Sequence, residues 1–206
     1  MPMEHNWNKN QILLHGCIAQ PPRFSHTSHG ADYYTLVFAV SRLSGTHDEV
    51  NVLLAETLLD QSCLAQGDHL TIAGEVRSFN NHTPQGRRLI ITVFAHTIIR
   101  ERGCDVNTLQ LAGTLCKPPN YRRTPLGRDI CDMMIAINRS YGRTDYLPCI
   151  SWGSLAQRCG CLTVGTTLSL EGRLQSRIYT KKLPDGAQER TAFEISVGQI
   201  ELLTTS

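Results

Sequence analysis

Aromatic and cationic residues are concentrated in the second half of the chain, in a combination that suits binding of nucleic acid. Tyr146 and Trp152 lie six positions apart in one predicted strand, so their side chains point to the same face. Single strands are held by aromatic rings on which bases stack and by cations that follow the phosphates. The cations that we expect around these rings are Arg122, Arg123, Arg128, Arg139, Arg143, Arg173, Arg177, Lys181 and Lys182.

The charge of the chain is distributed unevenly between its two halves. Residues 1–103 carry 8 Lys and Arg against 9 Asp and Glu, a net charge of −1, whereas residues 104–206 carry 12 against 9, a net charge of +3. Scattered surface arginines often serve only solubility. Here they lie among the aromatic residues, and Arg173 and Arg177 share one strand face. We therefore expect a binding surface in the second half.

The two halves are copies of one another at an offset of 97 residues, or 98 after a one-residue insertion. A period near 100 is far longer than that of solenoid repeats, so each copy is a whole small domain. The predicted domains are residues 1–104 and 105–206. The recurring residues include Asn10, Gly16, Arg42, Asp48, Gly74 and Ser78, which return as Asn107, Gly113, Arg139, Asp145, Gly172 and Ser176.

Within each copy, hydrophobic residues recur mainly with period two, which predicts short antiparallel strands. Five strands with one helix between the third and the fourth is the order of an OB-fold barrel. The predicted fold class is all-β, with two tandem five-stranded OB-fold barrels, each with a short helix between strands 3 and 4. In the second copy we predict strands over 108–116, 129–139, 146–152, 167–179 and 190–202, a loop over 118–127, a helix over 154–159, and a last loop around 184–186. In the first copy we predict the helix near 56–65 and the last loop at 80–86.

An ordered set of residues spans nearly all of the second copy and carries a family resemblance. The set is Asn107, Leu111, Gly113, Pro119, Arg122, Gly127, Ala136, Arg139, Ser151 to Ala156, Gly165, Glu171, Gly172, Gln175, Ser176 and Arg177. Together these residues resemble the bacterial single-stranded DNA-binding protein family. The resemblance implies a barrel that binds single strands without sequence readout, in an assembly of four barrels.

The resemblance also implies four base-stacking positions, and all four are aromatic in the second copy. Together with seven of the cations, they form the predicted nucleic-acid-binding set. The set is Tyr141, Tyr146, Trp152, Tyr179, Arg122, Arg123, Arg139, Arg173, Arg177, Lys181 and Lys182.

The first copy lacks the aromatic set, because the equivalent positions hold Ser44, Glu49, Ala55 and Asn81. We expect this copy to be mainly a structural partner, supplying the barrel-to-barrel contact that a second subunit supplies elsewhere in the family. An alternative is that it binds nucleic acid through substitutes. Those substitutes are Phe24, Tyr33, Tyr34, Phe79, Arg87 and Arg88.

No motif of the sequence points to an enzyme, a metal site or a cofactor. His26 and His29 have no cysteine pair with zinc-ribbon spacing and are expected to be loop histidines. Cys159-Gly160-Cys161 lacks the spacing of the dithiol redox motif. The eight cysteines are expected to be reduced thiols, mostly small core residues.

The predicted function is single-stranded DNA binding without strong sequence specificity, in replication, recombination or repair. The alternative is an OB-fold module for protein interaction or assembly, as in a primosome. Nothing in the sequence distinguishes DNA from RNA.

The predicted assembly is a homodimer with four barrels, and no membrane segment or signal peptide is expected, so we predict a cytoplasmic location. Typical family members end in an acidic tail, whereas this sequence stops at Ser206, soon after its last predicted strand. We therefore expect a specialised binder, for example on a mobile element, rather than a housekeeping hub.

Overall fold

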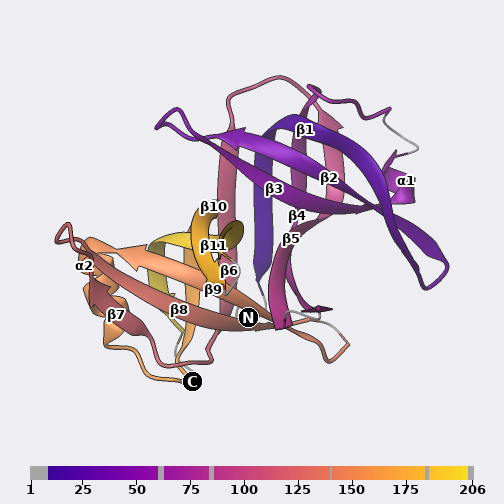
Figure 1. Ribbon diagram of the computed structural model, residues 1–206. Helices are drawn as coiled ribbons and strands as arrows, with labels where there is room; N and C mark the ends of the chain where they lie inside the picture. Colours follow the sequence, from indigo (N-terminus) through magenta and orange to yellow (C-terminus); the bar gives the residue numbers. More distant parts are fainter. Residues whose placement is uncertain (1–8, 60–62, 84–85, 140, 184–185, 204–206) are drawn as a thin grey trace, which may run out of the picture.

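The protein consists of two β-barrels joined edge to edge in one sheet, as the computed structural model shows (Figure 1). The structure describes residues 9–59, 63–83, 86–139, 141–183 and 186–203. The first barrel contains β1 (Asn10–Ser28), β2 (Ala31–Ser41), β3 (His47–Ala55), α1 (Glu56–Leu59), β4 (His69–Thr83) and β5 (Gly86–Arg100). The second contains β6 (Val106–Leu115), β7 (Asn120–Arg123), β8 (Asp129–Asn138), β9 (Thr144–Trp152), α2 (Gly153–Gly160), β10 (Thr167–Leu183) and β11 (Gly186–Leu202).

Each barrel closes through the same pattern of strand pairs. In the first barrel β1 pairs with both β2 and β4, and β3 joins β5 in parallel, so that five strands form a ring. In the second barrel β6, β8, β9, β11 and β10 form the equivalent ring, with β9 and β11 parallel. This is the predicted tandem OB-fold, and the prediction of the fold class is confirmed.

Details of the strands differ from the sequence expectation. The predicted loop 118–127 contains β7, which pairs with β8 along the barrel rim. The strands of both final hairpins also reach further than predicted, since β10 continues to Leu183 and β11 begins at Gly186. The helix expected near 56–65 is described only over Glu56–Leu59. The expected boundary after residue 104 lies in the segment between β5 and β6.

Two equivalent glycines permit the sharp bend that closes each barrel. Gly74 in β4 and Gly172 in β10 both lie at a shift in strand register, against β5 and β11. A Cβ at Gly74 would collide with the carbonyl oxygen of Phe94, and one at Gly172 with that of Ser196. Such bulges bend and twist a strand, and here they require a residue without a side chain.

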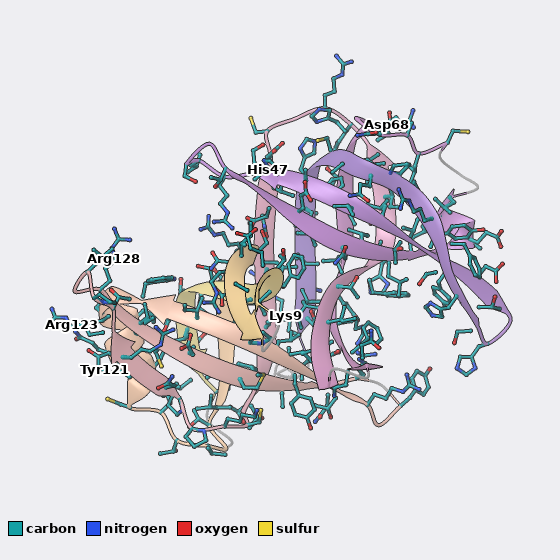
Figure 2. All side chains as sticks on the ribbon, in the orientation of Figure 1. Lys9, His47, Asp68, Tyr121, Arg123 and Arg128 are labelled. Atoms are coloured by element: carbon teal, nitrogen blue, oxygen red, sulfur yellow. The ribbon has the colours of Figure 1, made fainter. Side chains whose placement is uncertain are left out.

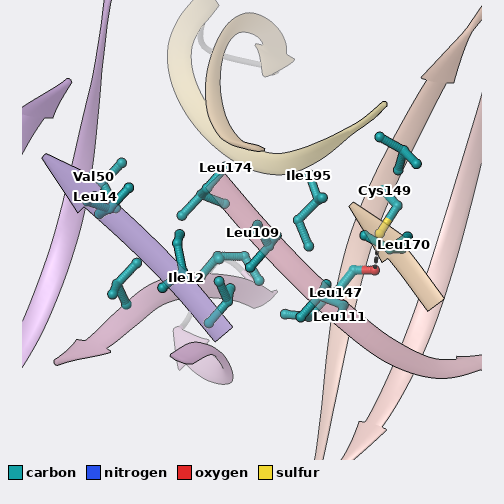
Figure 3. Close-up of a cluster of buried hydrophobic side chains, with 14 of the residues drawn as sticks. Ile12, Leu14, Val50, Leu109, Leu111, Leu147, Cys149, Leu170, Leu174 and Ile195 are labelled. Atoms are coloured by element: carbon teal, nitrogen blue, oxygen red, sulfur yellow. Dashed lines mark hydrogen bonds between the residues drawn. The ribbon is translucent and has the colours of Figure 1, made fainter. Parts of the chain in front are cut away.

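The two barrels meet where β1 pairs with β6 in antiparallel orientation. Ile12 lies directly opposite Leu109, its own equivalent at offset 97, so a local two-fold axis passes between them. Both side chains are buried, and the apolar cluster runs through them from one barrel into the other (Figure 3). The two cores therefore form one continuous hydrophobic cluster.

A buried carboxylate is held at each side of this junction. Asp48 on β3 is 1% exposed and forms an ion pair with Arg42 of its own barrel. It also accepts hydrogen bonds from the second barrel, from the backbone N–H of Ser176 at 2.7 Å and from its hydroxyl at 3.1 Å. Arg42 completes the contact by donating to the Ser176 carbonyl oxygen at 3.0 Å.

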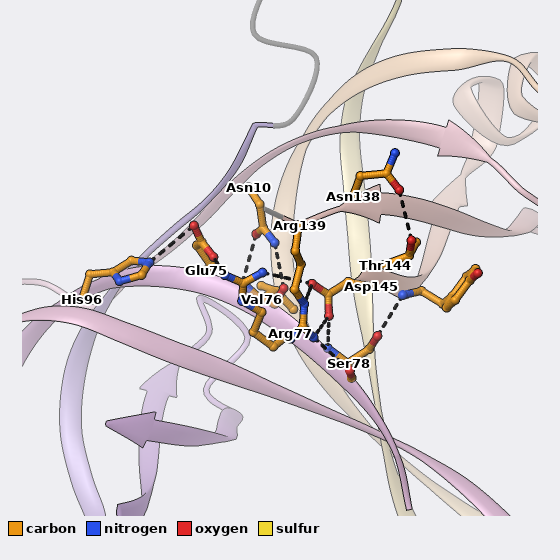
Figure 4. Close-up of polar contacts among 11 residues, drawn as sticks. Asn10, Glu75, Val76, Arg77, Ser78, His96, Asn138, Arg139, Thr144 and Asp145 are labelled. Atoms are coloured by element: carbon orange, nitrogen blue, oxygen red, sulfur yellow. Dashed lines mark hydrogen bonds and ion pairs between the residues drawn. The ribbon is translucent and has the colours of Figure 1, made fainter. Parts of the chain in front are cut away.

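The other side of the junction repeats this arrangement with the barrels exchanged (Figure 4). Asp145 on β9 is fully buried, forms an ion pair with Arg139, and accepts from the backbone N–H of Ser78 at 2.5 Å. Arg139 donates to the Ser78 carbonyl oxygen at 3.1 Å. Arg77 of the first barrel adds a contact to Asp145 at 3.3 Å. We call the Arg–Asp–Ser set on each side a clamp.

The clamp around Asp48 sets the ionisation of that carboxylate. Burial alone would raise the pKa of Asp48, but the hydrogen bonds from Arg42 and Ser176 outweigh it and lower the pKa below its ordinary value. The pKa of Arg42 is raised, mainly by its hydrogen bond to Asp48. The ionised pair is thus the stable form across neutral pH.

No helix in the described part of the chain is long and apolar enough to cross a membrane.

The clamp predicts a specific acid dependence of stability. Because the pKa of Asp48 is lower in the folded state, its contribution is present above the unfolded pKa near ~3.9 and is lost as pH falls through the folded pKa. Asp48→Asn should lower the free energy of unfolding at pH 7 by about 3 to 5 kcal/mol, because it leaves Arg42 without its partner. It should also flatten the loss of stability below pH ~4. Urea unfolding at pH 3 to 7 measures both effects.

The control for this experiment is Asp132→Asn, which removes an exposed pair with Arg122 and should cost less than about 1 kcal/mol. Wild-type stability in the Asp48→Asn variant would show that the clamp does not contribute.

Candidate nucleic-acid interface

A groove on the outer face of the second barrel contains the chemistry expected of a single-strand site. Its volume is about 560 Å³. Trp152 lies at the end of β9 and is 42% exposed, so one face of its ring is open to solvent. The residues that line the groove are Arg42, Arg122, Thr124, Ile130, Ile150, Trp152, Arg173, Gln175, Ser176, Arg177, Glu194 and Ser196.

Trp152 and Tyr146 lie on the same face of β9, as the sequence predicts, but they stand at opposite ends of the strand. Both are partly exposed, Tyr146 by 45%, while Asp145 and Leu147 on either side of Tyr146 are buried. Six residues of a strand span about 20 Å. The two rings therefore cannot hold neighbouring bases, and any strand that contacts both must follow the length of β9.

Arg173 and Arg177 enter the groove from β10 and differ in how much of their charge is neutralised. Arg173 is exposed and donates to the Gln175 side chain at 3.5 Å, and it forms no ion pair with a described carboxylate. Arg177 lies 3.6 Å from the Glu194 carboxylate. Arg173 is thus the more available cation for a phosphate.

The arginines of β7 are bound to acidic residues of β8. Arg122 donates to Asp132 at 3.0 Å, and Arg123 lies 3.5 Å from Asp129, both with exposed side chains. Figure 2 shows Arg123 at the outer end of the second barrel, away from the first. Exposed pairs of this kind are weak and can exchange a carboxylate for a phosphate.

Two further residues of the predicted set lie at the junction with the first barrel and in the turn between β8 and β9. Arg139 is part of the Asp145 clamp, with its guanidinium 5.3 Å from the centre of the Phe79 ring. Tyr141 is fully exposed in the turn and has a left-handed backbone with φ 75°. Arg139 therefore has a structural partner already, whereas Tyr141 is free to contact a ligand.

Three residues of the predicted set lie on β10 beyond the part whose side chains are described. Tyr179 pairs with Arg190 of β11, and Lys181 and Lys182 follow toward the end of the hairpin. Their strand continues the wall of the groove formed by Arg173 and Arg177.

The equivalent surface of the first barrel is filled by aromatic rings. Phe94 on β5 occupies the place of Ser196, and Tyr33 on β2 the place of Ile130, while Ala55 replaces Trp152. The rings of Tyr33 and Phe94 contact each other at 6.2 Å. Glu75 stands where the second barrel has Arg173. The groove is thus open and cationic in one barrel, and occupied in the other.

A larger hollow of about 860 Å³ crosses the β1–β6 pair, and its chemistry differs from that of the groove. Its lining includes Gln11, Leu13, Thr108, Gln110 and Glu171, with no arginine, lysine, phenylalanine, tyrosine or tryptophan. This hollow is larger than the groove, but it lacks both the Phe, Tyr or Trp rings and the Lys or Arg cations that single-strand binding requires. The smaller groove is the better candidate.

Sequence reasoning missed two features of the groove. Arg42 lines it from the first barrel, where its clamp contact with Ser176 places it. The sequence contains one signal that could have revealed this role: arginine stands at the equivalent positions 42 and 139 of the two copies. The equivalence of Ser196 and Phe94 was also missed. The final hairpin of the second barrel is longer than that of the first, which shifts the alignment of the last strand.

The cysteines and histidines of the described residues form no cluster that could hold a metal ion. Cys131, Cys149 and Cys159 are buried, as expected of core thiols, and burial raises the pKa of Cys131 to about 11. The expectation of core positions is wrong for Cys63, Cys104 and Cys161, which are exposed. His26 stacks on Tyr33 at 5.2 Å rather than lying free in a loop.

The geometry defines a tandem OB-fold protein with one open, cationic groove. Comparison with known proteins agrees, because residues 106–203 match the model of the single-strand binding protein family. The resemblance seen in the sequence is therefore confirmed, and the second barrel carries the pattern of that family. The match covers the barrel that contains the open groove.

Individual proteins show the same likeness. The chain is 32% identical over 107 residues to the single-stranded DNA-binding protein of Neisseria meningitidis, covering 48% of this chain and 60% of that protein. It is 31% identical over 81 residues to the single-stranded DNA-binding protein A of Bacillus subtilis, covering 36% and 47%. The chain thus spans about half the length of these curated relatives.

A solved structure matches both barrels together. The single-stranded DNA-binding protein of Thermus aquaticus superposes with a TM-score of 0.79 at 22% identity, covering 97% of this chain and 95% of that one. This likeness establishes the tandem fold. Each of these proteins is named for single-stranded DNA binding.

Proposed function

We propose that this protein binds single-stranded DNA without strong sequence preference, through the groove of its second barrel. The observation that carries the proposal is an open groove whose lining contains both the half-exposed ring of Trp152 and Arg173. A ring and an unpaired cation supply the stacking and the phosphate neutralisation that single strands require. The match of this barrel to the single-strand binding family favours this function over an assembly module.

The proposed contacts are those predicted from the sequence, and they fall into two roles. Tyr141, Tyr146, Trp152 and Tyr179 stack bases. The arginines and lysines neutralise phosphates along the groove and the β10–β11 hairpin, with Arg139 acting mainly through the clamp. A role in replication, recombination or repair and a cytoplasmic location belong to this proposal.

Titration with oligo-dT tests the proposal directly. Trp7 is replaced by Phe so that Trp152 is the remaining tryptophan of the chain's two. We expect its fluorescence to be quenched, because a base stacks on the ring. The logarithm of the affinity should fall with the logarithm of salt concentration by about 0.7 per phosphate neutralised. Absence of both quenching and binding at low salt would refute the function.

The open groove can be closed by one substitution taken from the first barrel. Ser196→Phe introduces the ring that Phe94 supplies there, on an equivalent backbone. We expect it to weaken oligo-dT binding by about 1 to 3 kcal/mol, the value of one stacked base, because the ring blocks access to Trp152. Ser196→Ala is the matched control and should bind as the wild type does. Fluorescence anisotropy of a labelled oligonucleotide measures both, and equal affinities would place the strand elsewhere.

We also propose that two copies of the chain associate, giving four barrels. The supporting observation is that Leu13 and Ile99 are exposed on the outer face of the joined sheet, and Leu13 lines the 860 Å³ hollow. A second copy seated on this face would cover Leu13. The sheet is continuous across both barrels through the β1–β6 pair, so this face is formed by strands of both barrels.

Leu13→Glu should break this association, because it places a charge in an apolar contact. Sedimentation equilibrium should give twice the chain mass of 23.0 kDa for the wild type and the single mass for Leu13→Glu. Leu43→Glu, at a fully exposed turn position, is the control and should remain dimeric. A wild-type protein of 23.0 kDa at micromolar concentration would exclude the dimer.

A further inference from the structure

The two sides of the barrel junction have the same clamp but differ in the residues beside it. On one side, the residues that follow Asp145 and Ser78 are Tyr146 and Phe79. On the other side, the residues that follow Asp48 and Ser176 are Glu49 and Arg177. Local two-fold symmetry therefore places an aromatic pair at one crossing between the barrels and a charged pair at the other.

The aromatic side of the junction is held closely and faces solvent. The backbone N–H of Tyr146 donates to the Ser78 hydroxyl at 2.8 Å, which brings β9 of the second barrel against β4 of the first. Tyr146 is 45% exposed and Phe79 is 39% exposed. Two open rings from different barrels thus lie on either side of one cross-barrel hydrogen bond.

Phe79 is kept in place by a residue of the other barrel. The guanidinium of Arg139 lies 5.3 Å from the centre of its ring, and Arg139 is fixed in turn by Asp145. Arg77, two residues earlier on the same face of β4, reaches Asp145 at 3.3 Å and forms an ion pair with Glu75, so both acids at this crossing are paired with arginine. The Phe79 ring therefore has the Arg139 guanidinium against it and is 39% exposed, which suits stacking of a base on the open part of the ring.

The other side of the junction is unsuited to a nucleic acid strand. The Glu49 side chain is 54% exposed, so its carboxylate would meet a phosphate in solvent. Arg177 lies 3.6 Å from Glu194, and no equivalent acid exists on the first side, where Thr92 occupies that place. A phosphate at this crossing would be repelled by Glu49 and Glu194.

From this asymmetry we infer that single-stranded DNA passes from the second barrel to the first at one crossing only, where Phe79 of the first barrel stacks a base next to Tyr146. The inference rests on the proposed function and extends it, since it makes the first barrel a contributor to the binding surface of the second. The strand runs from Trp152 along β9 to Tyr146 and then to Phe79. It does not cross at Glu49.

Tryptophan reporters test the path of the strand. In a background of Trp7→Phe and Trp152→Phe, Phe79→Trp places the sole tryptophan at the proposed crossing. His47→Trp places it beside Glu49 at the other crossing while keeping that carboxylate. Oligo-dT of about 30 nucleotides should quench the first reporter and leave the second unchanged. Quenching of both, or of the His47→Trp reporter alone, would overturn the single crossing.

Affinity measurements test whether Phe79 contributes to binding. Phe79→Ala should weaken binding of the same oligo-dT about 5- to 150-fold, the range for one stacked base, and Phe79→Tyr should restore it. Phe24→Ala removes a more exposed phenylalanine of the same barrel, packed on Tyr34 away from the clamps, and should bind as the wild type does. Thermal unfolding of each variant checks that the fold is intact.

The results separate this inference from the proposed function. If Trp152 is quenched in the Trp7→Phe protein while Phe79→Ala binds as the wild type does, the inference is wrong and the function stands. If no reporter is quenched and the wild type does not bind, both fail. Loss of binding in Phe24→Ala but not in Phe79→Ala would place the first barrel's contact elsewhere and overturn the inference.

Discussion

The structure depends on two buried carboxylates that neither barrel can stabilise alone. Asp48 and Asp145 are almost fully buried, and each receives an arginine from its own barrel and a serine N–H from the other. A buried charge is tolerated only when its partners and hydrogen bonds are all present, so separating the barrels would leave both carboxylates short of donors. The barrels are therefore fixed relative to one another, and the groove of the second barrel can include Arg42 of the first as part of its wall.

The same constraint explains which residues the two copies share. Glycines such as Gly74 and Gly172 recur because the barrel cannot bend otherwise, and Arg42, Asp48 and Ser78 recur with their equivalents because the clamp requires them twice. Sequence reasoning grouped Arg139 with the phosphate-binding cations because it is basic and lies among aromatic residues. Its partner Ser78 is 61 residues away in the other barrel, a contact that no periodicity of the sequence reveals.

Much of the fold could be predicted because period-two patterning and turn residues are local signals. The strand order, the helix position and the shared face of Tyr146 and Trp152 follow from them, and the tandem arrangement follows from the repeat at offset 97. The short strand β7 was missed because all four of its residues are exposed and give no apolar alternation. The exchange of Ser196 for Phe94 was missed because the offset between the copies grows from 98 in the fourth strand to 102 in the fifth, which only the strand pairing reveals.

The two crossings between the barrels can differ in sequence in this single chain, whereas they cannot differ in a symmetric dimer of single barrels. In a two-fold dimer every substitution appears at both sides of the interface, so a glutamate at one crossing is also a glutamate at the other. Here the two copies are encoded separately, so the equivalent positions can hold Glu49 on one side and Tyr146 on the other. The clamps hold the barrels in place on both sides, so the residues beside them are free to diverge without loss of the junction. The repeat thus accounts for the two clamps, and the difference between Glu49 and Tyr146 makes the two crossings unlike, which is the asymmetry from which we infer a single crossing for the strand.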